Sequence, residues 1–386
     1  MSKLWQHYVF RRGVQVPALW DDLFTGRAVR LLYITGRGFD PRARSTMQSL
    51  VQNIASAGHK IEKATLLLVE LTGYQLEQSL VELTTQNAQA LQEFFAPLGN
   101  TVTITIGSSL RAEEEISASS ALRLGTEQVV AHVTDHTDII LDISSLPRIA
   151  YLAFATSLLT KLIPNKSIPD ALFAGGVNLQ IIVAEDPVLD GRILSEDPSN
   201  DLVLIPGFSS VLYAESAKEW PMVWFPILGD NRVNQLKKLE SIIPETAEVC
   251  PVLPHPARDP RRAERLLVEY KAPLFDTRQT PPSDFLYVHE SQPFEAYRQL
   301  LSAMRRYQTS MSILGGCRLV VTPLASKLIT LGAGLACFEM HAPNLEGNSG
   351  VAIAHAEPTR YVVSPQDLHA SKPELSSLLV TGQAYE

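Results

Sequence analysis

One short segment of the sequence combines glycines and arginines in a way that suits an anion. It reads TGRGFDPR and directly follows a β-rich run, Val29–Thr35. The two glycines let the backbone turn tightly and approach a ligand, because they have no Cβ. The two arginines carry planar guanidinium groups that match phosphate or carboxylate oxygens. The alternative is an ordinary strand-to-helix turn with surface arginines. The predicted ligand-binding residues are Thr35, Gly36, Arg37, Gly38, Asp40 and Arg42.

Two further loops have a common anatomy, in which a buried strand leads through polar residues into a very apolar helix. The first is DISSLPR, Asp142–Arg148, and the second is TPLASK, Thr322–Lys327. The free N–H groups and the dipole of a helix N-terminus favour anions, and hydroxyls can donate to their oxygens. The alternative is that these side chains cap the helix and pair locally. We predict ligand contacts from Asp142, Ser144, Ser145, Arg148, Thr322, Ser326 and Lys327.

Weaker candidates lie in the second half of the chain. The loop LGDNR supplies Gly229, Asn231 and Arg232 as predicted ligand residues, although an ordinary capped turn explains it equally well. The basic segment Pro254–Arg265 either binds phosphates or forms a solvated helix face paired to Asp259 and Glu264. Glu70 and Glu290 stand after strands, where they either meet a ribose hydroxyl or form salt bridges.

Several chemistries are not supported. The glycine-rich segment lacks the third glycine of a dinucleotide fingerprint and the lysine of a phosphate-binding P-loop, so we expect no NAD, no ATP hydrolysis and no cofactor. His132 and His136 have a metal-like spacing, but the segment passes from a predicted helix into a loop, so we predict no metal site. The sequence shows no recognisable catalytic set, and the catalytic residues stay unknown.

Composition limits the class of protein. The 386 residues carry a net charge of −8, which makes direct binding to duplex DNA unexpected. The three cysteines, Cys250, Cys317 and Cys337, are scattered in apolar surroundings and fit reduced thiols better than a disulfide framework. The longest apolar run falls short of the roughly 20 residues needed to cross a bilayer. We expect a cytoplasmic protein without a membrane partner.

Strands alternate with helices along the chain, which predicts an α/β fold with mostly parallel sheets. In the first half, strands are expected at Val29–Thr35, Ala64–Glu70, Thr101–Ile106, Ile139–Ile143 and Asn178–Ala184. After a region rich in Asp, Pro, Ser and Gly, a second series is expected at Val223–Leu228, Val249–Leu253, Phe285–His289, Leu319–Thr322 and Tyr361–Ser364. Both series have five units, and in each the fourth unit has the polar loop and the most apolar helix.

This parallel predicts an internal duplication, with two Rossmann-like domains. A coincidental pair of α/β domains is the alternative. The predicted boundaries are an N-terminal strap at 1–27, domain 1 at 28–190, a linker at 191–220 and domain 2 at 221–386. We expect the carboxyl ends of both sets of strands to face a shared cleft.

The spacing Asp142-x-Ser144-x-x-x-Arg148 after strand four resembles the signature of the CARF family, the Rossmann-like sensors of CRISPR-associated defence. Two such halves in one chain resemble the related SAVED arrangement of prokaryotic anti-phage systems. The resemblance implies a sensor for a cyclic oligonucleotide, held in the cleft between two such domains by the loops after strands one and four. Thr35 and Gly36 stand at the strand-one position. In the second half, Thr322 and Lys327 are one residue out of register and the aspartate is missing.

Three functions remain open on the sequence. The first is a sensor or regulatory subunit that binds a phosphorylated nucleotide and works with a partner protein. The second is an enzyme acting on a nucleotide or phosphoribosyl substrate by positioning and electrostatics. The third is a scaffold subunit of a defence complex that uses its tryptophans, Trp5, Trp20, Trp220 and Trp224, as interface anchors.

Overall fold

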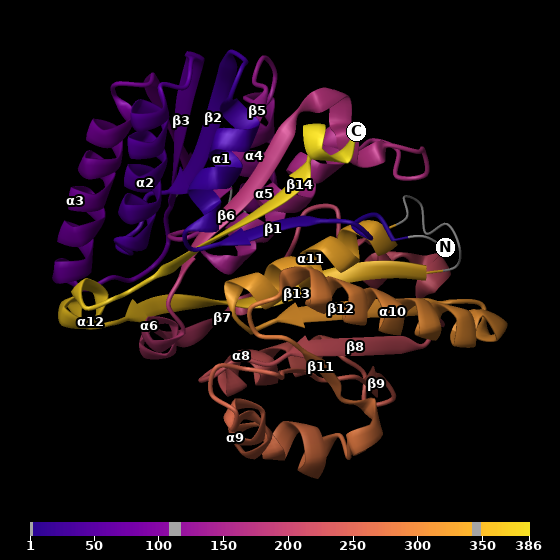
Figure 1. Cartoon of the computed structure of the whole chain (residues 1–386). Helices are drawn as coiled ribbons and strands as arrows, with labels where there is room; N and C mark the ends of the chain where they lie inside the picture. Colours follow the sequence, from indigo (N-terminus) through magenta and orange to yellow (C-terminus); the bar gives the residue numbers. More distant parts are fainter. Residues whose placement is uncertain (1–2, 108–116, 342–348) are drawn as a thin grey trace. The chain divides into compact units, whose positions relative to one another are not determined.

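The computed structural model describes residues 3–107, 117–341 and 349–386 (Figure 1). It forms two compact units, unit 1 with Met1–Leu194 and Arg360–Glu386, and unit 2 with Ser195–Thr359. Unit 2 is therefore inserted into the chain of unit 1, and each unit is described by itself. The sequence predicted instead that the second domain runs to residue 386. The difference arises because residues near the C-terminus form a strand of the unit 1 sheet.

The sheet of unit 1 has seven strands in the order β1-β14-β6-β5-β2-β3-β4. The five strands from β6 to β4 are parallel, whereas β14 pairs antiparallel with both β6 and β1. Figure 1 shows β14, in yellow, beside β1 and β6. The strands are β1 (Val9–Arg12), β2 (Val29–Gly36), β3 (Ile61–Leu71), β4 (Asn100–Ile106), β5 (Asp138–Asp142), β6 (Asn178–Glu185) and β14 (Glu374–Thr381).

Helices cover both faces of this sheet. The helices α1, α2 and α3 pack on one face through a core that includes Trp20, Met47 and Phe95. On the other face α4 lies against β4, where Gly125 sits directly on the side chain of Ile106. The helices of unit 1 are α1 (Gln15–Phe24), α2 (Arg42–Ala57), α3 (Gln78–Phe95), α4 (Ala118–Ala131), α5 (Arg148–Leu162), α6 (Pro187–Arg192) and α12 (Pro365–His369).

Unit 2 has a sheet in the order β11-β10-β8-β12-β13-β7, with β9 paired to β8. Its strands are β7 (Leu194–Leu204), β8 (Met222–Ile227), β9 (Glu248–Val249), β10 (Val252–Pro254), β11 (Leu286–Val288), β12 (Cys317–Pro323) and β13 (Ser349–Val362). Its helices are α7 (Ser210–Tyr213), α8 (Val233–Leu239), α9 (Arg262–Glu269), α10 (Pro293–Met311) and α11 (Lys327–Met340). Shorter helical turns in the two units lie at Ala171–Gly176, Glu215–Ala217, Glu240–Ile242, Ala272–Thr277, Pro282–Asp284, Ser312–Leu314 and Gln383–Tyr385.

The predicted fold class is confirmed, since both units are Rossmann-like α/β structures with mostly parallel sheets. When numbered along the chain, the five strands β2 to β6 of unit 1 have the spatial order 3-2-1-4-5. The same order is found in unit 2 for β8, β10, β11, β12 and β13. The helix that follows the fourth strand is the most deeply buried of its unit, as its even distribution of apolar residues predicts. Ten residues of α5 and twelve of α11 are buried.

The structure also bears on the predictions about the cysteines, the membrane and the tryptophans. All three cysteines are buried and free, and burial raises the pKa of the Cys317 thiol to about 11. None of the described helices has both the length and the apolar character needed to cross a membrane. Trp5, Trp20 and Trp224 are fully buried within their units, so they are core residues and not exposed interface anchors.

Candidate functional site

The strand order creates a switch point in each sheet, where chain connections leave in opposite directions. In unit 1 the switch point lies between β2 and β5, and in unit 2 it lies between β8 and β12. Ligands of open α/β sheets bind outside the carboxyl ends of the strands at such points. The loops singled out in the sequence follow these four strands. The predicted ligand residues therefore gather at one switch point in each unit.

An equivalent hydrogen bond crosses the switch point of each unit, although different residue types form it. In unit 1 the Tyr33 hydroxyl donates to Asp142 Oδ2 over 2.8 Å. In unit 2 Trp224 Nε1 donates to Thr322 Oγ1 over 2.9 Å. Each acceptor lies two residues beyond the direct strand partner of its donor, which makes Asp142 and Thr322 structurally equivalent. Burial, and then the nearby Asp142 carboxylate, raise the pKa of Tyr33, so its hydroxyl stays a donor.

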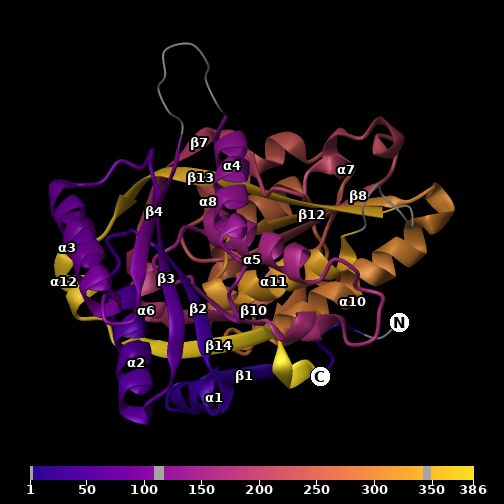
Figure 2. The same cartoon turned by 90° about the horizontal axis from the view of Figure 1, so that it is seen from above.

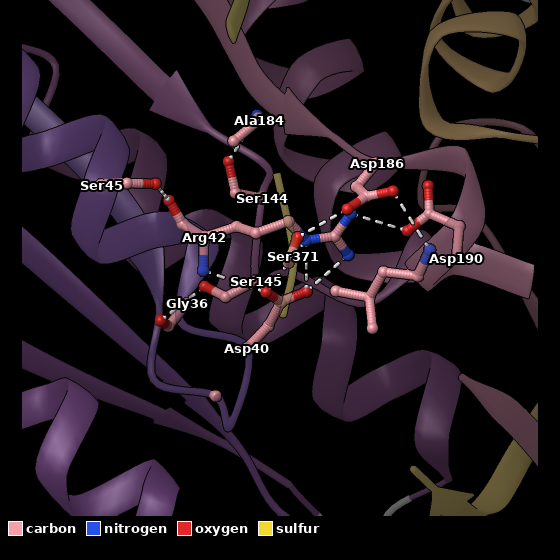
Figure 3. A network of polar contacts seen from close by, with 12 residues as sticks. Gly36, Asp40, Arg42, Ser45, Ser144, Ser145, Ala184, Asp186, Asp190 and Ser371 are labelled. Atoms are coloured by element: carbon pink, nitrogen blue, oxygen red, sulfur yellow. Dashed lines mark hydrogen bonds and ion pairs between the residues drawn. The ribbon is translucent and has the colours of Figure 1, made fainter. Parts of the chain in front are cut away.

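The polar residues of the loop after β5 hold that loop in shape. Asp142 Oδ1 accepts from the backbone N–H of Ser144 over 2.9 Å, and Ser144 Oγ accepts from the N–H of Ala184 over 2.9 Å. Ser145 Oγ donates to the carbonyl of Gly36 over 2.8 Å. Figure 3 shows the two serine contacts. These three predicted ligand residues thus act first as the frame that joins the loop after β5 to the ends of β2 and β6.

The loop after β2 is held equally firmly. The carbonyl of Gly38 accepts from Asn87 Nδ2 over 3.0 Å, and the Arg37 N–H donates to the carbonyl of Val69 over 2.7 Å. Arg37 also forms an ion pair with Glu70 at 3.0 Å, with both side chains partly exposed. Glu70 is therefore a salt-bridge partner, which is one of its two predicted roles. A loop fixed in this way is ready for a ligand without further ordering.

Arg42 belongs to a buried ionic network and not to an exposed surface (Figure 3). Its guanidinium lies 2.6 Å from Asp40 Oδ2 and 2.8 Å from Asp190 Oδ1, and its side chain is 2% exposed. Burial alone would lower the pKa of Arg42, but the two carboxylates outweigh it and raise that pKa. Asp40 and Arg42, both predicted to bind ligand, are thus paired within unit 1.

The same corner of unit 1 contains a carboxylate that the sequence analysis did not single out. Asp186 caps α6 and is almost fully buried. Burial would raise its pKa, but hydrogen bonds outweigh this effect and lower it. The groups that donate to Asp186 are the backbone N–H of Val188, Leu189 and Lys372 and the hydroxyl of Ser371. An Asp-Pro pair at a helix start was the available signal, since aspartate is a preferred N-cap and proline a preferred first residue.

The lowered pKa of Asp186 predicts a pH dependence of stability. Because its folded pKa lies below the unfolded value, the contribution is complete above about pH 4 to 5 and is lost as the pH falls through the folded pKa. We expect Asp186→Asn to lower the melting temperature at pH 7 and to have a smaller effect near pH 3. Thermal unfolding of both proteins across this range tests it. An equal difference at both pH values would contradict the prediction.

In unit 2 the loop after β8 lies against the loop after β12. A Cβ on Gly229 would lie 2.1 Å from the carbonyl oxygen of Leu324, so only glycine fits. Asn231 has a left-handed backbone with φ of 59°, and its N–H donates to Glu269 over 2.8 Å. Arg232 Nη1 donates to the carbonyl of Asn231 over 3.2 Å. As in unit 1, where Gly36 touches Ser145, a glycine lets the two switch-point loops meet.

In each unit, the helix that follows the fourth parallel strand begins with a positively charged residue. Arg148 is the first residue of α5, and Lys327 is the first residue of α11, preceded by Ser326 as the cap residue. Counted from the equivalent residues Asp142 and Thr322, the chain reaches the helix start one residue sooner in unit 2 than in unit 1. This shortening explains the one-residue offset of the sequence motif, because it brings lysine to the same helical position as arginine. Each cation thus stands at a helix N-terminus, where the dipole also favours an anion.

At each switch point one hydroxyl of a predicted ligand residue has no hydrogen-bond partner among the described residues. They are Thr35 Oγ1, fully buried at the end of β2, and Ser326 Oγ, at the start of α11. A buried hydroxyl without a partner is costly, so each such group calls for an explanation. Both residues were predicted to contact a ligand. A ligand oxygen at either switch point would supply the missing partner.

Two of the four arginines in the basic segment after β10 form ion pairs. Arg262 contacts Glu290 and lies 2.6 Å from Asp230 Oδ2, and Arg265 contacts Asp259. This arrangement agrees with the alternative of a helix face paired within its own unit, with Asp259 as one of the expected partners. It also accounts for Glu290, which is a salt-bridge partner.

His132 is the C-cap residue of α4 and His136 lies beyond the helix, so the segment passes from a helix into a loop as expected. His136 Nδ1 contacts the carbonyl of His132 at 2.9 Å. Burial, and then the charge of Lys63, lower the pKa of His136. Among the described residues, no group of three or more His, Cys, Asp and Glu side chains is arranged to hold a metal ion.

Comparison with known proteins adds no family. No protein-family model and no curated protein matches the sequence. One similar solved structure is a protein from Pseudomonas aeruginosa UCBPP-PA14 provisionally assigned as a universal stress protein, with 10% identity, 89% of this chain and 96% of that chain covered, and a TM-score of 0.21. Another is a GsuK channel bound to NAD, with 10% identity, 92% and 77% coverage, and a TM-score of 0.17. The fold assignment therefore stands on the topology of the two sheets.

Proposed function

We propose that this protein binds a phosphorylated nucleotide at its switch points and acts as a sensor or regulatory subunit in prokaryotic defence. The observation that carries the proposal is the repeated construction of the two switch points. Each has a helix that starts on a cation, a close contact between its two loops, and a hydroxyl without a partner in the described chain. Cation, helix dipole and hydroxyl donors are the groups that hold phosphate oxygens.

The resemblance to CARF and SAVED proteins supplies the ligand class, a cyclic oligonucleotide. Within the motif, Asp142 and Ser144 shape the loop, and Arg148 stands at the helix start. We therefore assign ligand contact in unit 1 to Arg148 and Thr35 before the other motif residues. In unit 2 the corresponding assignment is Lys327 and Ser326. The loop frame of each unit keeps these groups in place before the ligand arrives.

The proposal predicts that Arg148→Ala and Lys327→Ala each weaken nucleotide binding at least tenfold. The reason is the loss of a charge-assisted hydrogen bond of about 1.5–3 kcal/mol. A thermal-shift screen with mono-, di- and cyclic oligonucleotides, NAD, S-adenosylmethionine and phosphoribosyl pyrophosphate identifies the ligand first. A ligand at about a hundred times its Kd stabilises the fold by about 2.7 kcal/mol, which moves the melting temperature by a few degrees. Isothermal titration of the two variants then gives the change in affinity.

The matched control is Lys60→Ala, which removes an exposed cation just before β3, at the opposite end of the unit 1 sheet. It is expected to bind like the unmodified chain. Wild-type affinity in both switch-point variants would overturn the site assignment. Chromatography of the bound nucleotide after incubation decides between sensor and enzyme, because turnover of the ligand would favour the enzyme.

A further inference from the structure

Within the described residues, the strand paths of the two sheets end in four edge strands, and three of them carry features that block pairing with another chain. Edge strands expose unpaired backbone groups, and proteins protect them with short length, charge, proline or bulges. β1 has four residues, two of them arginine, and β11 has three residues. β7 contains Glu196 and Pro198. The fourth edge, β4, has none of these protections.

β4 reads NTVTITI and spans seven residues without a charge, a glycine or a proline. Six of the seven residues are β-branched, the type that favours an extended strand. Its register with β3 runs without a bulge from Asn100 to Ile106. Among the described residues β3 is the only strand that pairs with β4 (Figure 2). A long, regular and uncharged edge of this kind is a template for a further strand.

The direction of the backbone groups shows which residues are available for pairing. The carbonyl of Ile106 accepts from the N–H of Thr72, so the backbone groups of Ile106 point toward β3. Backbone direction alternates along a strand, so those of Val102 and Ile104 point the same way. The backbone N–H and C=O groups of the three threonines between them therefore point outward. These residues are Thr101, Thr103 and Thr105.

We propose that β4 pairs antiparallel with β4 of a second copy of this chain, about a twofold axis at Thr103. In that register Thr103 lies opposite its own copy and Thr101 lies opposite Thr105, so all outward backbone groups find partners. Val102 lies opposite Ile104, and no like charges meet. The strand is thus complementary to itself, as a twofold interface requires. The resulting dimer joins two seven-stranded sheets into one.

The experiment is the measurement of mass in solution by light scattering for the full chain. The wild type is expected at twice the chain mass of 42.5 kDa. Thr103→Lys is expected at the single-chain mass, because two lysines would face each other at the twofold axis. Thr103→Pro is expected to do the same, since proline removes an outward N–H without touching the bonds to β3.

Two variants serve as controls. Thr103→Val keeps the β-branched shape and the backbone donor, so it is expected to stay dimeric. Thr85→Lys places the same new charge on the exposed surface of α3 and is also expected to stay dimeric. Hydrogen exchange of the wild type adds a measurement that needs no variant, because the Thr103 amide should lose protection on dilution. A monomeric wild type, or a dimer unchanged by Thr103→Lys, would overturn the proposal.

Discussion

Replacing Arg42 with methionine is expected to lower the free energy of unfolding by about 3–5 kcal/mol. The reason is that removing one partner from a buried ion pair leaves the opposite charge without compensation. Here the charges left behind are the carboxylates of Asp40, whose side chain is 9% exposed, and Asp190, at 30%. Chemical denaturation of the two proteins under the same conditions measures the difference.

The chain offers a matched control for this prediction. Arg123 pairs with Glu127 on the surface of α4, where both side chains are more than half exposed. Arg123→Met should change stability by about 0.5 kcal/mol or less, because exposed pairs contribute little. Combining Arg42→Met with Asp40→Asn and Asp190→Asn should recover part of the loss. A loss below about 1 kcal/mol for Arg42→Met alone would show that the network is not desolvated.

Gly229→Ala is the second substitution with a large expected effect, a loss of about 3 kcal/mol from overpacking. A Cβ at this position would lie 2.1 Å from the carbonyl oxygen and 2.8 Å from the carbonyl carbon of Leu324. Both atoms belong to the backbone of the loop that leads into α11, so the loop itself must move. We expect the variant to unfold at lower temperature and to lose the contribution of Lys327 to ligand binding.

Gly36→Ala, at the comparable contact in unit 1, is the control. Its two nearest neighbours would be the side chains of Leu146 at 2.9 Å and Ser145 at 3.0 Å, which can shift more easily than a backbone. The nearest backbone atom would be the carbonyl oxygen of Ser145 at 3.1 Å, against 2.1 Å at Gly229. Its loss of stability should therefore be smaller than that of Gly229→Ala. Calorimetry of both variants compares them directly. Equal melting temperatures for the two would contradict the steric argument.

Most helices and strands could be predicted from the sequence because each depends on a pattern within a few neighbouring residues. Strands with continuous apolar runs and helices with a repeated apolar face fold where they were predicted, and Gly58 ends α2 with φ of 66°. Likewise α5 and α11 are buried because their apolar residues leave no polar face. The strands β1 and β14 were missed, and β13 lies mostly before the strand expected at Tyr361–Ser364. Both β1 and β14 pair with segments more than 180 residues away along the chain, which no local pattern records.

The sequence predicts where the loops of the candidate site lie, but not how their polar groups are used. The loops at the carboxyl ends of the strands follow from the alternation of strands and helices, and the structure brings them together. What the sequence could not show is which polar groups are already used within the fold. Arg42 and Arg148 look alike as residue types, yet Arg42 is buried because Asp190 comes from 148 residues further along the chain. Both arginines begin a helix, and only the folded structure shows that Arg42 is a buried framing residue.

The insertion of unit 2 sets the order in which the nascent chain can fold. In unit 1, β1 leaves the ribosome first among the described strands, and β14, its partner in the sheet, leaves last. Between them the ribosome makes all of Ser195–Thr359, a unit with its own sheet and core. Domains usually fold in the order of their synthesis, N-terminal first. Here the middle of the chain can finish folding while the unit that encloses it still waits for its last strand.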